Sequence, residues 1–594
     1  MIRRADHRTW RVRTCMHLPG LAPLAGALIL ASCTDARADV TPAVGNQSLG
    51  TQVITPASCT SICVLEITGG TRAGPNLFHR FQAFDTRPSN ASNIPPISGV
   101  TFQNGLSTNA ASNVIVGVLS PTHISVPINL QSPASLFWLS PAGITMSGSG
   151  SFTNLSHLTL STASGLQLAS DLTGLQTFDA IQTTTTDIQS LNLSGSPDTG
   201  LAGLSTNQDS LGALAPSLST NGNIVLQGGL LTVDQSLLLD AQGGNVQISN
   251  ASLAGNTLTV SGQANQGNGI AISTSQLTAG SGGLSIFSSN GGVQLGGTFQ
   301  SESSVLVQAS QGVTLTNQAQ ISAIACIECS KDALVVSAGG GPFINQAGAS
   351  AFSVSNGGRW LIYANSPQGT ALGGLAINFK QYGKAFGDQL PILGSSTENG
   401  LLYEIAPSIG AGLANFSRVY DGTALATIGS ENLQVNGALD GDVVLLNATG
   451  AYVTVGNSPV LNAGPEDVGT GKTVVAQVSL DSVSSSLAQG SVPVYGYQLN
   501  SANSTVSTSS ASITPAELTV GGLVAQGKVY DATTSVILSG SPTVSPLNDD
   551  LVSVAGTPTA SFADRAVGIG RPVTISGLTL AGSDAGNYTL ALVG

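Results

Sequence analysis

The chain has 594 residues but little charge and few aromatic side chains: 8% of its residues are charged and 5% are aromatic. Ordinary globular proteins carry about 25% charged residues. The 18 Lys and Arg are outnumbered by 31 Asp and Glu, which gives a formal net charge of −13. Nucleic-acid phosphates repel a chain of this sign, which argues against a nucleic-acid partner. Beyond residue 38 no run of about 20 uninterrupted apolar residues occurs, so we expect no transmembrane helix.

Glycine, in contrast, is abundant with 73 residues, and 41% of the chain is hydrophobic. Low charge with much Gly and Ser is found in disordered chains, but those chains lack the apolar content needed for a core. Here the apolar residues recur in short runs of β type. We therefore expect a folded chain, long enough for several domains.

The first residues are typical of an export signal. A start rich in Arg precedes an apolar stretch over residues 18–32, and the sequence "DARAD" offers a cleavage site after Ala38. A second interpretation competes, because Leu30-Ala-Ser-Cys33 fits the box that precedes a lipid-modified cysteine in bacterial lipoproteins. We favour a signal peptide over residues 1–38. Either interpretation predicts a protein that is exported from the cytoplasm.

Two close cysteine pairs follow this segment, Cys59 with Cys63 and Cys326 with Cys329. An exported chain meets oxidising conditions, so each pair is a candidate local disulfide. A CxxC pair also occurs in redox centres and in halves of zinc sites. No second close His/Cys set follows, so we favour structural disulfides.

From about residue 200 to 320 short apolar-x-apolar triplets recur at steps of about 20–26 residues, with Gly, Asn, Ser and Gln between them. One series occupies residues 224–226, 246–248, 270–272, 293–295 and 313–315, and a second occupies residues 237–239, 258–260, 284–286 and 305–307. Each triplet alternates with period two, as a half-buried strand does. Two or more short strands in each repeat predict a parallel β-helix, whose coils stack to share one apolar column and stack polar side chains outside it. The competing architecture is an array of antiparallel sandwiches.

This repeat region carries little catalytic chemistry. It lacks Lys, Arg and His, and its charged residues are Asp209, Asp234, Asp240 and Glu302. Glycoside hydrolysis needs a close pair of carboxylates across a cleft. Asp234 and Asp240 are near in sequence, but we expect solvated turn residues. No catalytic residue, cofactor or metal ligand is predicted.

Two separated segments resemble the secretion domain of two-partner-secretion exoproteins, the filamentous haemagglutinin family. The first is "ITGGTRAGPNLFHRFQAF" at residues 67–84, and the second contains Ser140-Pro-Ala-Gly-Ile144. The matching positions are Gly69, Gly70, Gly74, Asn76, Leu77, Phe78, His79, Phe81, Phe84, Pro141, Gly143 and Ile144. Arg80 stands where the family usually has Ser, and both Asn positions of the second motif differ. The resemblance implies that residues 39–200 are recognised by an outer-membrane transporter. Because the end of a β-helix exposes strand edges and an open apolar column, we expect Phe78, Phe81 and Phe84 to cap it.

The coil rhythm fades after about residue 345, where aromatic and Lys residues return. Residues 346–415 resemble the family's connector, and we expect a small separate core from Trp360, Tyr363, Tyr382, Phe386 and Tyr403. Arg418-Val-Tyr-Asp-Gly-Thr423 and Lys528-Val-Tyr-Asp-Ala-Thr533 then open two units that resemble the Tyr-Asp-Gly (YDG) repeats of bacterial adhesins, over residues 416–520 and 521–594. Asp421 and Asp531 are candidate calcium ligands, but a lone Asp after Tyr is more often a turn or cap residue, so we predict a turn role.

The predicted fold is all-β: a right-handed parallel β-helix with an N-terminal cap or secretion domain and a shaft over residues 201–345, followed by small β-sandwich-like repeats. The resemblances imply a non-enzymatic adhesin that an outer-membrane two-partner transporter exports, and that is secreted or held on the bacterial cell surface, at the outer membrane. Its receptor is expected on host cells, on other bacteria or in matrix. The alternatives are a carrier of a contact-dependent toxin or haemolysin-like effector, and a β-helix enzyme that acts on polysaccharide.

Overall fold

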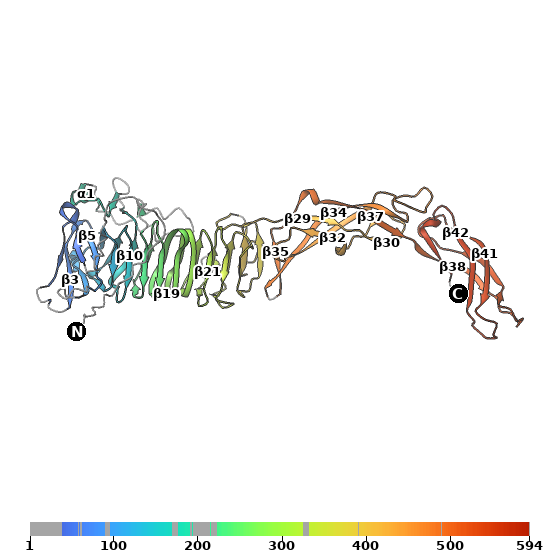
Figure 1. The fold of residues 1–594 in the computed structure, drawn as a ribbon, viewed down its shortest axis with the longest axis horizontal. Coiled ribbons are helices and arrows are strands. Elements are labelled where there is room, and N and C mark those ends of the chain that lie inside the picture. The colour runs from blue at the N-terminus through green and yellow to red at the C-terminus, as the bar shows by residue number, and fades with distance from the viewer. Residues whose placement is uncertain are drawn as a thin grey trace, which may run out of the picture.

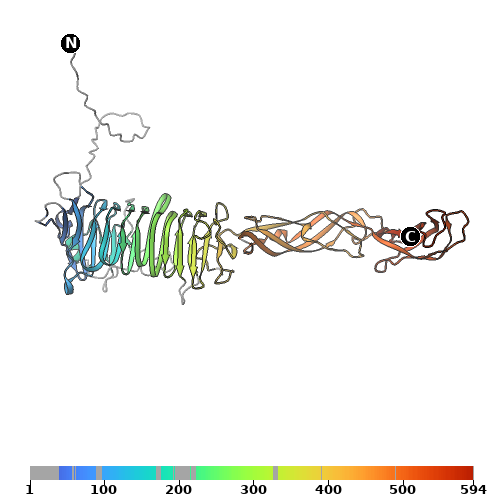
Figure 2. The same cartoon turned by 90° about the horizontal axis from the view of Figure 1, so that it is seen from below.

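The computed structural model describes residues 39–56, 59, 62–88, 96–168, 176–190, 193, 214–215, 222–324, 332–389, 391–488 and 490–592. These residues form an elongated rod, with the N-terminal coils at one end and the last β-unit at the other (Figures 1 and 2). The proposed cleavage site at Ala38, Cys33, the pair Cys326 and Cys329, and Asp209 lie outside the described residues.

The N-terminal part contains strands β1 to β14 and the helices α1 (Thr185–Ser190), η1 (Gly45–Ser48) and η2 (Ser107–Asn109). Its strands are β1 (Asp39–Pro42), β2 (Thr51–Ile54), β3 (Cys63–Gly69), β4 (Thr71–Ala73), β5 (Asn76–Asp85), β6 (Ile97–Phe102), β7 (Asn113–Val118), β8 (Thr122–Ile124), β9 (Pro127–Leu139), β10 (Ile144–Ser147), β11 (Ser151–Ser161), β12 (Gly165–Leu168), β13 (Gln176–Asp179) and β14 (Leu214–Ala215).

The middle of the rod contains strands β15 to β28. They are β15 (Ile224–Gln227), β16 (Leu230–Thr232), β17 (Ser236–Asp240), β18 (Val246–Ser249), β19 (Ser252–Ser301), β20 (Val305–Ala309), β21 (Val313–Leu315), β22 (Gln320–Ile324), β23 (Asp332–Ser337), β24 (Phe343–Asn345), β25 (Phe352–Ser355), β26 (Arg359–Ala364), β27 (Phe379–Tyr382) and β28 (Gly400–Tyr403).

The distal part contains strands β29 to β43 and three short 3-10 helices, η5 (Ser430–Asn432), η6 (Ser501–Asn503) and η7 (Ala585–Asn587). Its strands are β29 (Ser408–Leu413), β30 (Ser417–Val419), β31 (Leu425–Ala426), β32 (Leu433–Asn436), β33 (Val443–Tyr452), β34 (Gly469–Ala488), β35 (Gly490–Tyr495), β36 (Gln498–Leu499), β37 (Thr505–Thr514), β38 (Ala516–Ala525), β39 (Ser535–Val536), β40 (Leu538–Thr543), β41 (Ser553–Phe562), β42 (Val573–Ala581) and β43 (Tyr588–Leu592).

The strand register confirms both predicted series of triplets and the parallel β-helix. In the first series, Ile248 lies between Leu226 on one coil and Ile272 on the next, all in parallel pairing. In the second, Leu239 pairs with Val260 in the same way. Period-two alternation sends these side chains inward, where they are at most 2% exposed. Each coil therefore buries its apolar face against its neighbours.

The coil corners are built from residues that tolerate a left-handed backbone. Asn250 and Thr274 stand at the same corner of successive coils with φ of 52° and 46°. The Thr274 hydroxyl donates to Oδ1 of Asn250 at 2.7 Å, so the polar side chains stack from coil to coil as expected. Asn accepts this conformation more readily than other non-glycine residues because its short polar side chain bonds locally.

Antiparallel strands cover the first coil. Strand β5 pairs in parallel with β7 on its inner side, while β1 and β4 pair with it antiparallel. Strand β2 covers β3 antiparallel, and β3 pairs in parallel with β6. Unpaired strand edges are templates for unwanted pairing, and these antiparallel strands occupy the edges that the first coil otherwise exposes. The N-terminal end is therefore capped by its own sequence.

The parallel ladder continues past residue 345. Strand β25 pairs with β22, β26 with β23, and β28 with β26, all in parallel. Trp360, Tyr382 and Tyr403 consequently belong to the long apolar column of the shaft, and only Tyr363 with Phe386 packs in a small separate cluster. The separate connector core that the sequence suggested is thus mostly an extension of the shaft.

Two β-units follow in series, built from strands β29 to β37 and β38 to β43. In the first, β29 pairs antiparallel with β32 and parallel with β36. In the second, β38 pairs antiparallel with β40 and parallel with β43, which is the same arrangement. Each unit also holds a long hairpin, β33 with β34 and β41 with β42. The last unit begins at β38, five residues before the boundary at 521 that the motif suggested.

Candidate functional site

The aromatic residues of the first motif lie on strand β5 at the capped end. Phe81 and Phe84 are fully buried in the apolar column, where their rings meet edge to face at 5.1 Å. A β-bulge opposite Thr41 and Pro42 shifts the alternation, so that both rings reach the same side. Phe84 also packs edge to face on Trp138 of β9 at 4.6 Å. These rings close the end of the column.

Phe78 and Arg80 point to the opposite side of β5. Phe78 packs 5.0 Å from Phe178, and the guanidinium of Arg80 lies 5.7 Å from the same ring. Arg80 Nη1 donates to the carbonyl of Thr183 at 2.5 Å, and Nη2 donates to the carbonyl of Asp179 at 2.7 Å. Burial lowers the pKa of Arg80 to about 10. Arg80 therefore ties the outer segment with β13 and α1 to the cap.

His79 lies inside the cap rather than at a surface. Its side chain is fully buried, Nδ1 faces the hydroxyl of Thr51 at 3.3 Å, and its ring meets that of Phe102 at 5.4 Å. Burial lowers the pKa of His79 to about 3, so the imidazole is neutral at physiological pH. Gly70, with φ of 84°, leaves room for this ring, since a Cβ there would lie 2.8 Å from Cε1 of His79. The imidazole fills a structural position.

The other residues of the first motif are also structural in their contacts. Asn76 Nδ2 donates to the carbonyl of Leu193 at 3.0 Å, while its Oδ1 accepts from Asn113 at 2.8 Å. Leu77 is 6% exposed. Gly69 has φ of 70°, and a Cβ there would collide with the carbonyl oxygen of Gly50.

The second motif forms a coil corner close to the first. The backbone N–H of Gly143 donates to the carbonyl of Ser140 at 2.9 Å, and Gly143 has φ of 115°. Ile144 then starts β10, is 1% exposed, and pairs with Ile224 of the next coil. A Cβ at Gly222 would collide with the carbonyl oxygen of Pro141, so the next coil passes close over this turn.

The structure joins Cys59 and Cys63 by a disulfide next to this cap, with a Cα–Cα distance of 5.3 Å. Cys63 is the first residue of β3, and its backbone N–H donates to the carbonyl of Pro96 at 3.0 Å. The bond closes a loop of only four residues in sequence separation. Such a small loop yields modest entropic stabilisation, so its effect is local.

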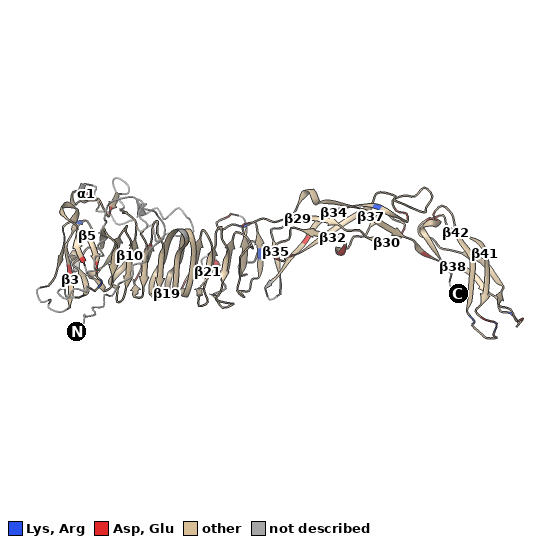
Figure 3. Cartoon of the chain, viewed as in Figure 1, with Lys and Arg blue, Asp and Glu red and all other residues tan. Residues whose placement is uncertain are grey.

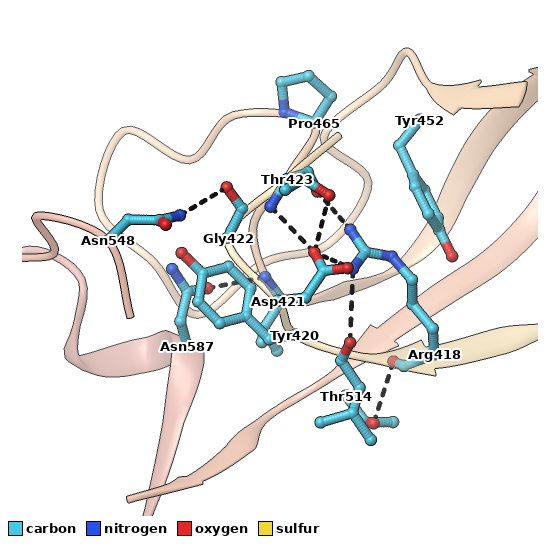
Figure 4. Close-up of polar contacts among 12 residues, drawn as sticks. Arg418, Tyr420, Asp421, Gly422, Thr423, Tyr452, Pro465, Thr514, Asn548 and Asn587 are labelled. Carbon is cyan, nitrogen blue, oxygen red and sulfur yellow. Dashed lines mark hydrogen bonds and ion pairs between the residues drawn. The ribbon is translucent and has the colours of Figure 1, made fainter. Parts of the chain in front are cut away.

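The two Tyr-Asp motifs fold into the same turn. Asp421 Oδ1 accepts from the backbone N–H and the hydroxyl of Thr423 at 3.0 and 2.9 Å, and forms an ion pair with Arg418 (Figure 4). Asp531 accepts from Thr533 at 2.9 and 2.8 Å, and Lys528 lies 2.9 Å away. Hydrogen bonds to the charged form lower the pKa of Asp531 to about 2. Both carboxylates act as turn residues.

The tyrosine of the first motif reaches into the next unit. Tyr420 donates to Oδ2 of Asp550 at 2.9 Å, and Tyr588 donates to the same oxygen at 2.6 Å. The two rings meet edge to face at 5.5 Å. Around this contact, Asn548 Nδ2 donates to the carbonyl of Gly422 at 3.1 Å (Figure 4). We call this arrangement of Tyr, Asp and Tyr across two units a junction.

A second junction of the same geometry connects the shaft to the first unit. Tyr382 of β27 donates to Oδ2 of Asp442 at 3.0 Å, Tyr497 donates to it at 3.0 Å, and the two rings meet edge to face at 5.0 Å. The backbone N–H of Leu439 donates to the Tyr497 hydroxyl, as that of Leu547 does to Tyr588. Tyr497 of the first unit thus occupies the position that Tyr588 has in the last unit.

This shaft junction also encloses a charge cluster. Lys380 Nζ is fully buried and lies 2.5 Å from Oδ1 of Asp442 and 3.0 Å from Asp440. Sequence reasoning missed this site, because Lys380-Gln-Tyr382 keeps the basic residue and the tyrosine of the motif but has Gly383 in place of Asp. The spacing from a basic residue to a tyrosine two positions later was the available signal. Burial raises the pKa of Tyr497 to about 12, so its hydroxyl group is uncharged at physiological pH.

The shaft contains few charged residues in the part of the chain that the structure describes (Figure 3). Asp234 and Glu302 are exposed, whereas Asp240 is 1% exposed and accepts from the Ser161 hydroxyl at 3.0 Å. The expectation that Asp240 is a solvated turn residue is therefore wrong, and burial raises the pKa of its carboxyl. A shallow hollow over Gln247, Ser273 and their neighbours has an amide, hydroxyl and aliphatic lining.

Among the described residues, no group of three or more His, Cys, Asp or Glu side chains is placed to hold a metal ion. In the same part of the chain, no helix combines the length and apolar character needed to cross a membrane.

Comparison with known protein families identifies one part of the chain. Residues 514–593 match the family described as the YDG domain. A search of solved structures returns the filamentous hemagglutinin secretion domain, at 16% identity and a TM-score of 0.25, with 53% of this chain and 94% of that chain covered. A search of curated proteins found no match. The last β-unit is therefore similar to YDG domains.

Proposed function

We propose that the chain is a non-enzymatic surface adhesin, exported by an outer-membrane two-partner transporter and used for attachment or aggregation. The observation that carries this proposal is the rod itself. One apolar column runs from Leu65 in the first coils to Val506 in the first β-unit, so that shaft and unit share a core. A rod of this kind holds its distal end away from its N-terminal end. That task does not require a catalytic group.

The junctions support the same proposal. Tyr382 and Tyr420 each insert into the next segment and are 2% and 4% exposed. Charge-assisted hydrogen bonds to Asp442 and Asp550 hold them there, and such bonds are stronger than neutral ones. Segments fixed in series in this way keep their relative orientation, which segments joined by flexible linkers do not.

The transporter role of the cap rests on the resemblance of the two motifs. The cap is closed by Phe81, Phe84 and Trp138, and its edges are covered by antiparallel strands. A folded, capped first coil offers a template on which later coils stack one at a time. Folding by successive stacking suits export through a narrow transporter, because each coil needs only its predecessor.

The test is expression of the full chain in a bacterium with and without a two-partner transporter, followed by protease treatment of whole cells. We expect surface chain only with the transporter, and attachment or aggregation only in those cells. Surface exposure that does not depend on the transporter would contradict the export proposal. Transporter-dependent exposure without attachment to host cells, bacteria or matrix would contradict the adhesin proposal.

A pair of matched deletions locates the export function. Because Asn76, Phe78 and Phe81 are buried, replacing them would unfold the cap whether or not a transporter reads it. We therefore compare deletion of residues 39–168, which removes the first coils, with deletion of residues 516–592, which removes the last unit. The first deletion is expected to abolish surface exposure and the second to preserve it. Equal loss in both would refute a special role for the cap.

A further inference from the structure

Among the described residues, the motif tyrosine of the last β-unit is not packed against an aspartate and a tyrosine of another unit, as it is in a junction. This tyrosine, Tyr530, is 64% exposed, whereas Tyr420 at the same position of the previous unit is 4% exposed. The turns that hold the two tyrosines have the same hydrogen bonds from Thr to Asp and the same ion pair with a basic residue. The difference therefore lies in what covers the ring and not in the turn.

The hairpin loop next to this tyrosine differs in the same way. In the first unit, the loop between β33 and β34 contains Val460 and Val468, which are 8% and 5% exposed. It contacts the next unit, since Val468 N–H donates to Oδ1 of Asn587 at 2.8 Å. In the last unit, the loop between β41 and β42 exposes Val567 and Ile569 at 81% and 105%. Val567 and Ile569 thus stand in the loop that corresponds to the one with the buried Val460 and Val468 in the first unit.

An open strand edge completes the surface. Strand β34 pairs with β33 on one edge, and with β37 and then β35 along the other. Strand β37 leads directly into the next unit. The counterpart of β34 in the last unit, β42, pairs only with β41 among the described strands. Val474 of β34 is fully buried, while Val573 at the corresponding end of β42 is half-buried. The core of the last unit is left open along this edge.

In the first unit all three features meet the neighbouring unit at one place, since Tyr420, Val468 and Ile513 of β37 belong to one apolar cluster with Tyr588. We propose that Tyr530, the loop with Val567 and Ile569, and the open edge of β42 form one docking surface. Its partner is another β-unit of the same construction. That partner adds a strand like β37 to the edge and seats Tyr530 against an Asp and a Tyr placed like Asp550 and Tyr588.

An intact second copy of this chain is a poor partner. Its Asp442 already accepts from Tyr382 and its Asp550 from Tyr420, so neither site receives Tyr530 without releasing its own tyrosine. The partner is therefore a unit with an open Asp–Tyr site. Main-chain pairing along β42 supplies affinity, and the tyrosine site supplies specificity, as in other cases of strand addition.

The test adds such a unit to the full chain. In the extended variant, residues 502–592 are repeated once after Leu592, which keeps the spacing found between Tyr497 and β37. Tyrosines are nitrated with tetranitromethane and modification at Tyr530 is measured by mass spectrometry. We expect Tyr530 to react readily in the parent chain and to fall to the level of Tyr420 in the extended chain.

Two variants of the extended chain serve as controls. Replacing by Ala the added copy's aspartate that corresponds to Asp550 should restore nitration of Tyr530. Tyr530→Ala should make the added copy more sensitive to protease while leaving the parent chain's last unit unchanged. An added copy that resists protease while Tyr530 still reacts fully would overturn the proposal. An added copy that is digested at once would overturn it too, because the surface would then fail to support a unit of its own kind.

Discussion

Asp550→Ala removes the acceptor at the centre of the junction between the two β-units. Its carboxylate accepts from Tyr420 at 2.9 Å and from Tyr588 at 2.6 Å, and both tyrosines are nearly buried. Alanine leaves two hydroxyl donors without this partner in a site that water enters poorly. The variant should therefore weaken the attachment of the last unit to the rod through the lost Tyr420 bond, and the packing inside the last unit through the lost Tyr588 bond.

The magnitude follows from the two hydrogen bonds. A hydrogen bond to a charged group contributes about 1.5–3 kcal/mol, and we take the lower value because Asp550 is half-buried. Two such bonds give about 3 kcal/mol, which corresponds to roughly a 100-fold change in the opening equilibrium. Tyr420→Phe keeps the ring and removes one donor, so we expect about half of this free energy.

The assay is native-state hydrogen exchange of the ladder between β38 and β43. These amides report local opening of the last unit, which global melting of a multi-segment rod does not isolate. The matched control is Asp549→Ala, which changes the neighbouring exposed carboxylate. Exchange should rise by about 100-fold in Asp550→Ala and stay unchanged in the control. Equal exchange in the two variants would refute the role of the junction.

Three further predictions concern the shaft, the alkaline limit and the N-terminus. Ile272→Asp places an unpaired carboxylate in the buried column and should destroy the protease resistance of the shaft. The adjacent, exposed Ser273→Asp should leave that resistance unchanged. Equal protease resistance of the two variants would mean that the register is wrong. Burial raises the pKa of Tyr497 to about 12 from an ordinary value near 10. The contribution of Tyr497 to stability is therefore complete below about pH 10 and is lost as pH rises through 12. Tyrosinate absorbance should appear together with opening of the shaft junction, and an ordinary titration near pH 10 would contradict this. Mass spectrometry of the mature chain should find Asp39 first in wild type and in Cys33→Ser, and an acylated Cys33 would overturn that expectation.

The β-helix was predictable because its signal is periodic and local. Triplets such as 246–248 and 270–272 alternate with period two and return after one coil, so both the inward face and the register follow from the sequence. The end of the shaft was not predictable in this way. Trp360 and Tyr403 were expected in a separate core, but larger aromatic side chains fill the same column in place of the Val and Leu of earlier coils.

The cap shows a second limit of the sequence pattern. The resemblance directed attention to Phe78, Phe81 and Phe84, and all three are buried. Their spacing did not reveal that Phe78 packs on the outer segment while the other two enter the column. The β-bulge opposite Thr41 and Pro42 decides this, and a bulge depends on a pairing partner distant in sequence.

The junctions show what the motif alone conceals. The repeated Tyr-Asp turn was recognisable in both units, but its tyrosine acts on an aspartate 130 residues away in the next unit. The third copy around Tyr382 was missed because it lacks the aspartate, and its Lys380 instead forms buried ion pairs with Asp440 and Asp442. Long-range pairing of this kind leaves no local periodicity to detect.

The central claim, that the rod is an attachment protein, is tested most directly with the purified mature chain on beads. Beads that carry the chain through its N-terminal end should bind host cells, bacteria or biofilm matrix, and soluble chain should compete for that binding. Beads that carry the chain denatured beforehand should not bind. Binding to none of these three surfaces, or release of sugar fragments from the matrix, would contradict the account.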